Sequence, residues 1–219
     1  MQPANIYHRY LSGSSLDAWA DRPADDWLSV REQAELRTWR DAGRRRAWLR
    51  GRALAKQLIA DHLAPGAAGN TIEILSRDTD GRVNRPRVSW NGVERGWSLS
   101  ISHTDRGVLA AICERSDVLL GVDVAVSRPL PASLSQLWFT QAERAWVAEA
   151  RSSGIACFIW SAKEALYKAC NRGESFDPRQ VEVLPHGRGT YGGAALQDLR
   201  LRSWTVDGHV AVMASLGNR

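Results

Sequence analysis

The stretch WSAKEALYK, residues 160–168, carries the strongest signal in the chain. A helix of about 3.6 residues per turn places Trp160, Glu164 and Lys168 on one stripe, with Lys163 beside it. A carboxylate beside ammonium groups suits a site that holds a metal ion and a phosphate together, because Mg²⁺ is usually bound through one or two carboxylates plus phosphate oxygens. The alternative is a solvent-exposed Glu/Lys pair that stabilises the helix by a few tenths of a kcal/mol. The rest of the sequence decides between these two interpretations.

The composition is that of a folded globular protein. The chain has 219 residues, of which 44% are hydrophobic and 24% are charged, enough for one large domain or two small ones. No apolar run approaches the ~20 residues that span a bilayer, and the N-terminal segment MQPANIYHRY lacks the basic-then-apolar pattern of a secretory signal. The three cysteines, Cys113, Cys157 and Cys170, are widely spaced and favour neither a disulfide framework nor a zinc site. We expect a cytoplasmic protein with no membrane partner.

Basic residues cluster in one segment. The net charge is +5, from 29 basic and 24 acidic residues, and eight of the basic ones fall between Arg37 and Lys56. Such a cluster fits a nucleic acid, a polyphosphate small molecule, an acidic protein partner or simply a solvated helix face. Arg52 and Lys56 are four residues apart, and Trp48 shares their side of the helix, so this face could clamp a phosphate.

The periodicity of the sequence predicts an α+β fold. We expect helices over residues 24–42, 44–64 and 140–151 and around Glu164, strands over residues 71–75, 97–102, 107–113, 119–126, 181–184, 199–206 and 209–216, and a turn-rich loop over residues 78–86. Thr140 with Glu143 three residues later is a capping-box arrangement. Helices and strands recur in two parts of similar size, with a junction near residues 114–120. We therefore divide the chain into an N-terminal subdomain, residues 1–115, and a C-terminal subdomain, residues 116–219.

An acidic residue interrupts an apolar strand in the segment GVDVA, residues 121–125. An ionised carboxylate is costly to bury unless it is paired or binds a metal, so Asp123 is a candidate ligand. The alternative is an aspartate that caps a turn at the frayed end of the strand. Strand alternation places Ala125 on the same face as Asp123.

A histidine flanked by hydroxyl groups ends another apolar strand, in the segment SISHT, residues 100–104. Ser102, His103 and the following turn can donate hydrogen bonds to a phosphate. The histidine could instead bond only to the loop backbone, or act as the base for a nucleophilic serine. A hydrolase of that kind is disfavoured, because the chain contains no Gly-x-Ser-x-Gly motif.

Together these segments resemble the 4′-phosphopantetheinyl transferases of the surfactin-synthetase-activating type. The order and approximate spacing match over residues 44–184, and the block Trp-Ser-x-Lys-Glu-Ala-x-x-Lys is highly specific. The Ser-His and Gly-x-Asp elements are weak evidence for the family when taken alone, but strong evidence when they occur together with this block. Residues 138–140, Trp-Phe-Thr, with Glu143 also resemble the family's Phe-x-x-x-Glu segment.

The resemblance implies a Mg²⁺-dependent holo-carrier-protein synthase. Such an enzyme moves the 4′-phosphopantetheine arm of coenzyme A to a serine of an acyl, aryl or peptidyl carrier protein and releases adenosine 3′,5′-bisphosphate. It also implies two similar α+β subdomains related by a pseudo-twofold axis, with coenzyme A and the active site in the cleft between them.

The resemblance assigns the reaction groups to the C-terminal subdomain. Asp123 and Glu164 match the family's Mg²⁺ ligands, and Glu164 is also the candidate base for the carrier serine. Lys168 matches the group that holds the diphosphate and assists the departing phosphate. Beside a bound cation the pKa of Glu164 would be held low.

The remaining matches contact coenzyme A. His103 with Ser102 would contact a phosphate of coenzyme A. Arg46 and Arg52 are the best choices for its 3′-phosphate, and Arg85, which precedes a proline, matches a basic family residue.

Ala125 departs from the family pattern, because many relatives carry a second acid at that position. Mg²⁺ tolerates the loss, since it readily keeps water ligands. We expect an acidic carrier protein as partner, no nucleic acid, and a monomer, because both parts of the site lie in one chain. The alternatives are a non-catalytic homologue and a basic nucleic-acid-binding module, which would leave Asp123 and the Glu164 helix without a role.

Overall fold

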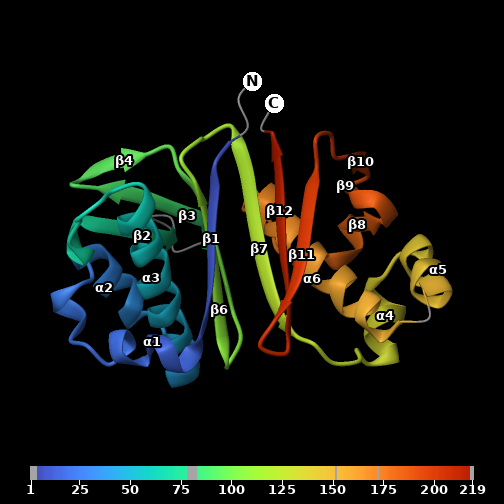
Figure 1. Cartoon of the computed structure of the whole chain (residues 1–219), viewed down its shortest axis with the longest axis horizontal. Helices are drawn as coiled ribbons and strands as arrows, with labels where there is room; N and C mark the ends of the chain where they lie inside the picture. The colour runs from blue at the N-terminus through green and yellow to red at the C-terminus, as the bar shows by residue number, and fades with distance from the viewer. Residues whose placement is uncertain (1–3, 78–82, 151, 172, 218–219) are drawn as a thin grey trace.

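Two α+β halves lie side by side in the computed structural model, which describes residues 4–77, 83–150, 152–171 and 173–217 (Figure 1). The first half contains β1 (Ile6–Ser12), α1 (Gly13–Ala20), η1 (Ala24–Asp26), α2 (Val30–Arg37), α3 (Ala42–His62), η2 (Gly69–Thr71), β2 (Ile72–Arg77), β3 (Val83–Trp90), β4 (Val93–Arg95), β5 (Ser98–His103) and β6 (Gly107–Cys113). The second half contains β7 (Val118–Val126), α4 (Ala132–Trp138), α5 (Gln141–Ala150), α6 (Ser153–Cys170), η3 (Pro178–Gln180), β8 (Val181–Leu184), η4 (Pro185–Gly187), β9 (Arg188–Tyr191), β10 (Ala194–Ala195), β11 (Arg200–Val206) and β12 (His209–Gly217). The expected α+β class is confirmed.

The two halves repeat one topology. Each has a strand, three α-helices, a small three-stranded sheet and two closing strands. The first half forms an antiparallel sheet of order β1-β6-β5, and the second forms one of order β7-β12-β11. The small sheets β2-β3-β4 and β8-β9-β10 also correspond. This repetition is the two-subdomain arrangement that the resemblance implies.

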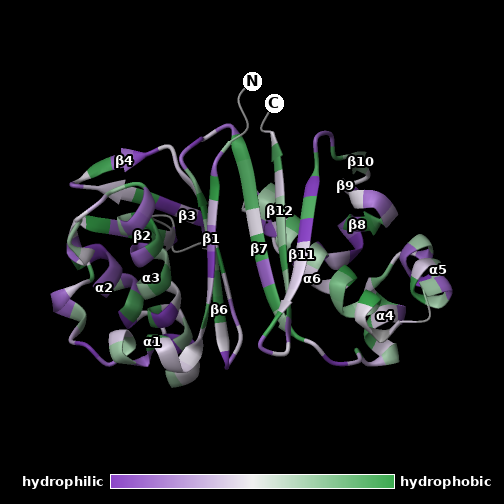
Figure 2. Cartoon of the chain, in the orientation of Figure 1, coloured by the Kyte–Doolittle hydropathy of each residue, from purple (hydrophilic) through white to green (hydrophobic). Residues whose placement is uncertain are grey.

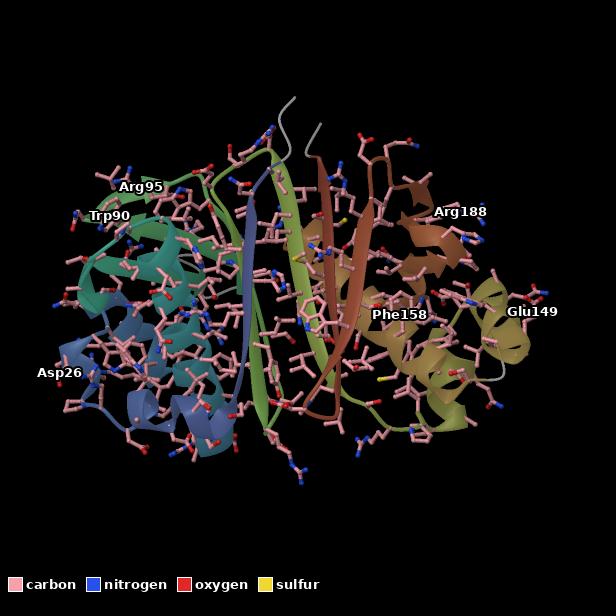
Figure 3. The ribbon with its side chains drawn as sticks, viewed as in Figure 1. Asp26, Trp90, Arg95, Glu149, Phe158 and Arg188 are labelled. Atoms are coloured by element: carbon pink, nitrogen blue, oxygen red, sulfur yellow. The ribbon has the colours of Figure 1, made fainter. Side chains whose placement is uncertain are left out.

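The central strands and the long helices form the core. β6 is buried along its whole length, and β12 is buried except at its last residue. Figure 2 shows apolar residues along β6, β7 and β12, where the two halves meet. The small sheets lie farther out, where the Arg95 guanidinium lies 5.1 Å from the centroid of the Trp90 ring (Figure 3). Within the described ranges, no helix is long and apolar enough to cross a bilayer.

A buried ion pair joins α2 to α3 in the first half. Ser29 and Glu32 form a capping box at the start of α2. The same Glu32 carboxylate accepts a hydrogen bond of 2.6 Å from Lys56 Nζ and one of 3.1 Å from the backbone of Ile74 in β2. One charged pair therefore links two helices and a strand inside the core.

The second half repeats this ion pair. Thr140 and Glu143 form the predicted capping box, with hydrogen bonds of 2.7 and 3.3 Å. Glu143 forms an ion pair with Lys163 Nζ on α6 at 2.8 Å. It also accepts a 2.8 Å hydrogen bond from the backbone N–H of Val183 in β8. Lys163 is fully buried, and its ammonium group belongs to this structural ion pair and not to the candidate site.

Serine side chains of β5 connect the two halves. Every second residue of a strand lies on the same face. Ser100 and Ser102 of β5 therefore share one face, and both contact the backbone of β7. Ser100 Oγ accepts from Val122 N at 2.9 Å, and Ser102 Oγ accepts from Val124 N at 3.3 Å. These bonds fix the register between β5 and the strand that carries Asp123.

Gly121 allows α6 to lie directly against β7. A Cβ atom at this position would meet the Ala165 carbonyl oxygen at 1.9 Å, so a larger residue would push the helix away. The close approach brings the α6 residues that follow Ala162 over the middle of β7.

Three local expectations differ from the structure. The predicted helix over residues 24–42 is divided into η1 and α2, which ends at Arg37. β1 and α1 have no counterpart among the predicted elements. Of the predicted loop over residues 78–86, residues 78–82 lie outside the described residues, and the remainder begins β3. Pro86 is tolerated there because the register with β2 shifts between Leu75 and Arg77. The boundary at residues 115/116 lies between β6 and β7 and stays a prediction.

Candidate active site

Asp123 is a buried carboxylate in the middle of the molecule. It lies on β7, and its side chain is 5% exposed. Oδ1 accepts a 2.8 Å hydrogen bond from Ser102 Oγ and a 2.9 Å bond from Lys168 Nζ. Three more residues of β7 follow it, so it is not a cap at a frayed strand end. The charge is compensated by an ammonium group and a hydroxyl group from two other elements.

Lys168 connects both halves through one ammonium group. Besides Asp123, it donates to Ser102 Oγ at 3.0 Å and to the Val122 carbonyl oxygen at 3.1 Å. Its Nζ lies 3.9 Å from Glu164 Oε2, one helical turn back on α6. The predicted stripe on this helix therefore faces Asp123.

Glu164 is less acidic than an ordinary glutamate. Its partial burial and the nearby Asp123 carboxylate raise its pKa to about 7, although the Lys168 ammonium and a hydrogen bond from Trp160 act in the opposite direction. The low pKa expected from the sequence assumed a bound cation. In the protein alone the pKa of Glu164 shifts in the opposite direction, because burial and then the Asp123 carboxylate disfavour its ionised form.

Two adjoining cavities open beside these groups. The acidic cavity, about 400 Å³, is lined by Ile101, Ser102, His103, Thr104, Asp123, Val124, Ala125, Trp160, Glu164 and Lys168. The apolar cavity, about 300 Å³, is lined by Ala47, Trp48, Gly51, Arg52, Ser76, Asn84, Arg85, Pro86, Leu99, Ser100, Ile101, His103, Tyr167, Lys168 and Asn171. Both cavities are lined by residues of both halves, and they share Ile101, His103 and Lys168.

His103 lies at the junction of the two cavities, at the end of β5. Its pKa is lowered, because the surrounding protein desolvates the ring and the Lys168 ammonium disfavours a second positive charge. A neutral imidazole at this junction can donate one hydrogen bond and accept another.

The structure separates the predicted arginines. Arg52 and Arg85 line the apolar cavity, whereas Arg46 lies outside it, paired with Asp17 and Asp21 of the first helical region. Arg52 is buried, and its guanidinium donates to Glu35, to the Ile74 carbonyl oxygen and to Ser76.

Arg85 crosses from one half to the other. Its Nε donates a 2.8 Å hydrogen bond to the carbonyl oxygen of Asn171, directly after α6. Sequence reasoning missed Asn171 and Tyr167 as cavity residues. The helical spacing could have indicated both, since Asn171 follows Lys168 by three positions and Tyr167 by four.

The carboxylates fit a divalent cation with few protein ligands. Among the described residues, no group of three or more acidic, histidine or cysteine side chains gathers into a metal site. Asp123 and Glu164 do face each other, and the Asp123 charge, together with burial, raises the pKa of Glu164. A divalent cation would offset this repulsion between the carboxylates. Two carboxylates match the usual protein contribution to Mg²⁺ binding, in which phosphate and water supply the remaining oxygens.

A family model matches part of the second half. Residues 119–214 match the 4′-phosphopantetheinyl transferase superfamily. The matched segment contains Asp123, Glu164 and Lys168 and is therefore similar to this superfamily over the main part of the candidate site. No curated protein matches the chain.

Many solved structures match part of the chain, and two of them are holo-acyl-carrier-protein synthases. One is a holo-(acyl-carrier-protein) synthase from Bacillus anthracis in complex with CoA (3′,5′-ADP), at 18% identity and a TM-score of 0.40, covering 50% of this chain and 94% of that one. The other is a holo-[acyl-carrier-protein] synthase from Thermotoga maritima, at 19% identity and a TM-score of 0.37, covering 47% of this chain and 65% of that one.

Proposed function

We propose that this protein transfers 4′-phosphopantetheine from coenzyme A to a serine of an apo acyl, aryl or peptidyl carrier protein. The main support is the meeting of Asp123, Glu164 and Lys168 from the second half with Ser102 and His103 from the first, around adjoining acidic and apolar cavities. The superfamily match over residues 119–214 supports the same reaction.

Asp123 and Glu164 would hold Mg²⁺. When bound, the ion would neutralise the charge of the diphosphate and so favour attack on phosphorus. Ala125 lines the same cavity and offers no side-chain oxygen, so phosphate and water would complete the coordination. An Ala125→Glu variant with tighter Mg²⁺ binding would show that this position reaches the ion.

The reaction exchanges one phosphorus–oxygen bond for another. The carrier serine oxygen attacks the phosphorus next to the pantetheine arm, and the bond to the bridging diphosphate oxygen breaks. Glu164 accepts the serine proton, directly or through a water molecule. Lys168 donates a hydrogen bond to the departing adenosine 3′,5′-bisphosphate, whose charge grows as the bond breaks.

The apolar cavity would bind coenzyme A. Trp48 and Pro86 offer apolar surfaces, and Arg52 and Arg85 are the arginines at the wall. We propose these two for the 3′-phosphate: Arg52 is buried and donates to Ser76, and Arg85 donates to the Asn171 carbonyl oxygen. Arg46 would act only at longer range, from its ion pairs outside the cavity.

The carrier protein is proposed to be acidic, because the net charge of +5 would steer such a partner toward the cleft. A monomer is sufficient, because the site is assembled from the two halves of one chain. We also propose a cytoplasmic location, because the three cysteines favour no disulfide framework, and a requirement for Mg²⁺, because Asp123 and Glu164 lie at one site.

The decisive experiment measures the mass of an apo carrier protein after incubation with this protein, coenzyme A and Mg²⁺. We expect a gain of one phosphopantetheine and its loss when EDTA is added. No gain with acyl, aryl and peptidyl carriers, together with salt-sensitive retention of DNA, would instead support the nucleic-acid-binding alternative.

A further inference from the structure

A buried histidine from the second half contacts the turn that carries His103. His209 is the first residue of β12, and only 2% of its surface is exposed. Its Nε2 lies 3.1 Å from Thr104 Oγ1, in the turn between β5 and β6. Its Nδ1 lies 2.9 Å from the Asp207 carbonyl oxygen and 3.3 Å from the Tyr10 hydroxyl.

The neighbours of the imidazole determine which nitrogen carries the proton. A carbonyl oxygen only accepts, so Nδ1 must donate to Asp207. Nε2 is then unprotonated and accepts from the Thr104 hydroxyl. That hydroxyl oxygen in turn accepts from the backbone N–H groups of Arg106 at 3.3 Å and Gly107 at 3.0 Å. The Gly107 carbonyl oxygen lies farther from the Thr104 hydroxyl, at 3.5 Å, so Nε2 at 3.1 Å is the nearer acceptor.

The first half fixes the rest of this turn. The Arg106 carbonyl oxygen accepts a 2.7 Å hydrogen bond from Gly13 N, and that of Asp105 accepts a 3.2 Å bond from Arg50. Gly107 lies against Tyr10, since a Cβ there would meet the Tyr10 hydroxyl at 2.3 Å. The Thr104 hydroxyl is the point at which the second half reaches this turn through His209.

This contact lies between the two groups of site residues. Thr104 lines the acidic cavity and directly follows His103, which lines both cavities. His209 pairs in register with Val126, three residues after Asp123 on β7. The histidine therefore joins the end of the strand that carries His103 to the end of the strand that carries Asp123.

We propose that His209 is a positioning residue for the transfer reaction, which holds Thr104 and with it His103 at the correct distance from Asp123 and Glu164. This inference rests on the proposed function. It requires an acceptor at the Nε2 position, because that atom receives the Thr104 hydroxyl proton. A small displacement of a binding group can cost as much as about 100-fold in rate.

Two substitutions separate the two nitrogens. His209→Gln can place an acceptor near the Nε2 position, and His209→Asn can keep a donor only near the Nδ1 position. Both remove a buried ring, so both should lower the melting temperature by similar amounts. We expect kcat/KM for coenzyme A to fall at least about tenfold in His209→Asn and to stay within about threefold of wild type in His209→Gln. Equal activities, or activities that follow the melting temperature, would overturn the proposal.

Thr104 supplies the matching half of the test. Thr104→Val should lower kcat/KM at least as much as His209→Asn, because it also removes the acceptor of the Arg106 and Gly107 N–H groups. The double variant should show no loss beyond that of Thr104→Val, because the His209 contact is already absent there. Thr104→Ser keeps the hydroxyl and should retain activity. Additive losses in the double variant would overturn the proposal.

Amide hydrogen exchange tests the contact without any activity. The amides of Arg106 and Gly107 should exchange faster in His209→Asn than in His209→Gln, because their acceptor loses its anchor. If the wild-type protein transfers no phosphopantetheine but the two variants still differ in exchange, the proposed function is refuted and the positioning contact stands. Equal exchange in both variants would overturn the contact itself.

Discussion

The two halves place opposite charges at corresponding positions of one topology. In the first half, Arg9 on β1 pairs with Asp61 on α3 at 2.8 Å. In the second half, Asp123 on β7 pairs with Lys168 on α6 at 2.9 Å. Asp61 and Lys168 each follow the buried lysine of their helix by five positions, 56 to 61 and 163 to 168.

The two pairs differ in their surroundings. The side chains of Arg9 and Asp61 are 33% and 50% exposed, whereas Asp123 is 5% exposed because Ser102 of β5 packs over it. Exposed ion pairs contribute little, but a buried carboxylate beside a second acid can bind a cation. The repeat thus supplies the scaffold, and the reversal of charge in one half supplies the chemistry.

The largest expected effect concerns what the halves share. Lys56→Met and Lys163→Met each leave a buried glutamate without its ammonium partner, so each should lower the free energy of unfolding by about 3–5 kcal/mol. Urea denaturation measures both. Adding Glu32→Gln or Glu143→Gln should restore part of the loss. A stable Lys163→Met variant that no longer transfers phosphopantetheine would show that this lysine belongs to the reaction and that the halves are not equivalent here.

The next effect concerns what the halves do not share. Asp123→Asn and Glu164→Gln should each lower kcat for carrier modification by about 10²–10³-fold, because each removes a carboxylate proposed to hold Mg²⁺ against the diphosphate. Arg9→Gln is the matched control at the corresponding position and should keep wild-type kcat. Full activity of either acidic-site variant with normal Mg²⁺ dependence would contradict the assigned roles.

The shared site of Asp123 and Glu164 should make the stability of the metal-free protein depend on pH. Glu164 has a raised pKa of about 7 in the folded state. Its contribution is therefore complete below about pH 4.5, the ordinary glutamate value, and is lost as the pH rises through 7. We expect a loss of about 1–3 kcal/mol, because the partly exposed carboxylate is also solvated.

Unfolding by urea in EDTA between pH 4.5 and 8 measures this loss, with Glu164→Gln as the reference. The free energy of unfolding of the wild type should fall relative to that of Glu164→Gln as the pH rises. A constant difference over this range would mean that Glu164 does not titrate beside Asp123.

The smallest effect is expected at the exposed pair. Arg9→Gln should change the free energy of unfolding by about 0–1 kcal/mol, and the change should shrink in high salt. Urea denaturation at low and high ionic strength measures it. A salt-independent loss of several kcal/mol would show that the first-half pair is as strongly coupled as the second-half pair.

Much of the framework is readable from local patterns. The helix over residues 44–64, the strands of the segments SISHT and GVDVA, and the capping box at Thr140 all appear close to their expected places. Their signals are local, namely apolar periodicity, a Pro-Gly stop after α3 and a side chain three residues from its partner. The candidate pair Asp123 and Glu164 also comes from such patterns, because a charge inside an apolar segment is conspicuous.

Other assignments depend on partners far away in the chain. Arg46, Arg52 and Lys163 looked alike as basic residues on helices, yet the structure gives them an exposed ion pair, a buried network and a core salt bridge. Sequence spacing cannot distinguish these three environments, since the acidic partner of each basic residue lies on another helix. The division into two similar parts was predicted, but β1 and α1 were not, because their sequences lack a strong periodic pattern.

The sequence by itself determined which side chains could do chemistry, because residue type and local spacing set charge, helix face and strand alternation. Only the tertiary structure decided which of them meet. Gly121 lets α6 approach β7, and the serines of β5 bind that strand from the other half, so Asp123, Glu164 and Lys168 converge. Long-range packing selected this cluster, since burial and the pairing of charges depend on all the elements around a residue.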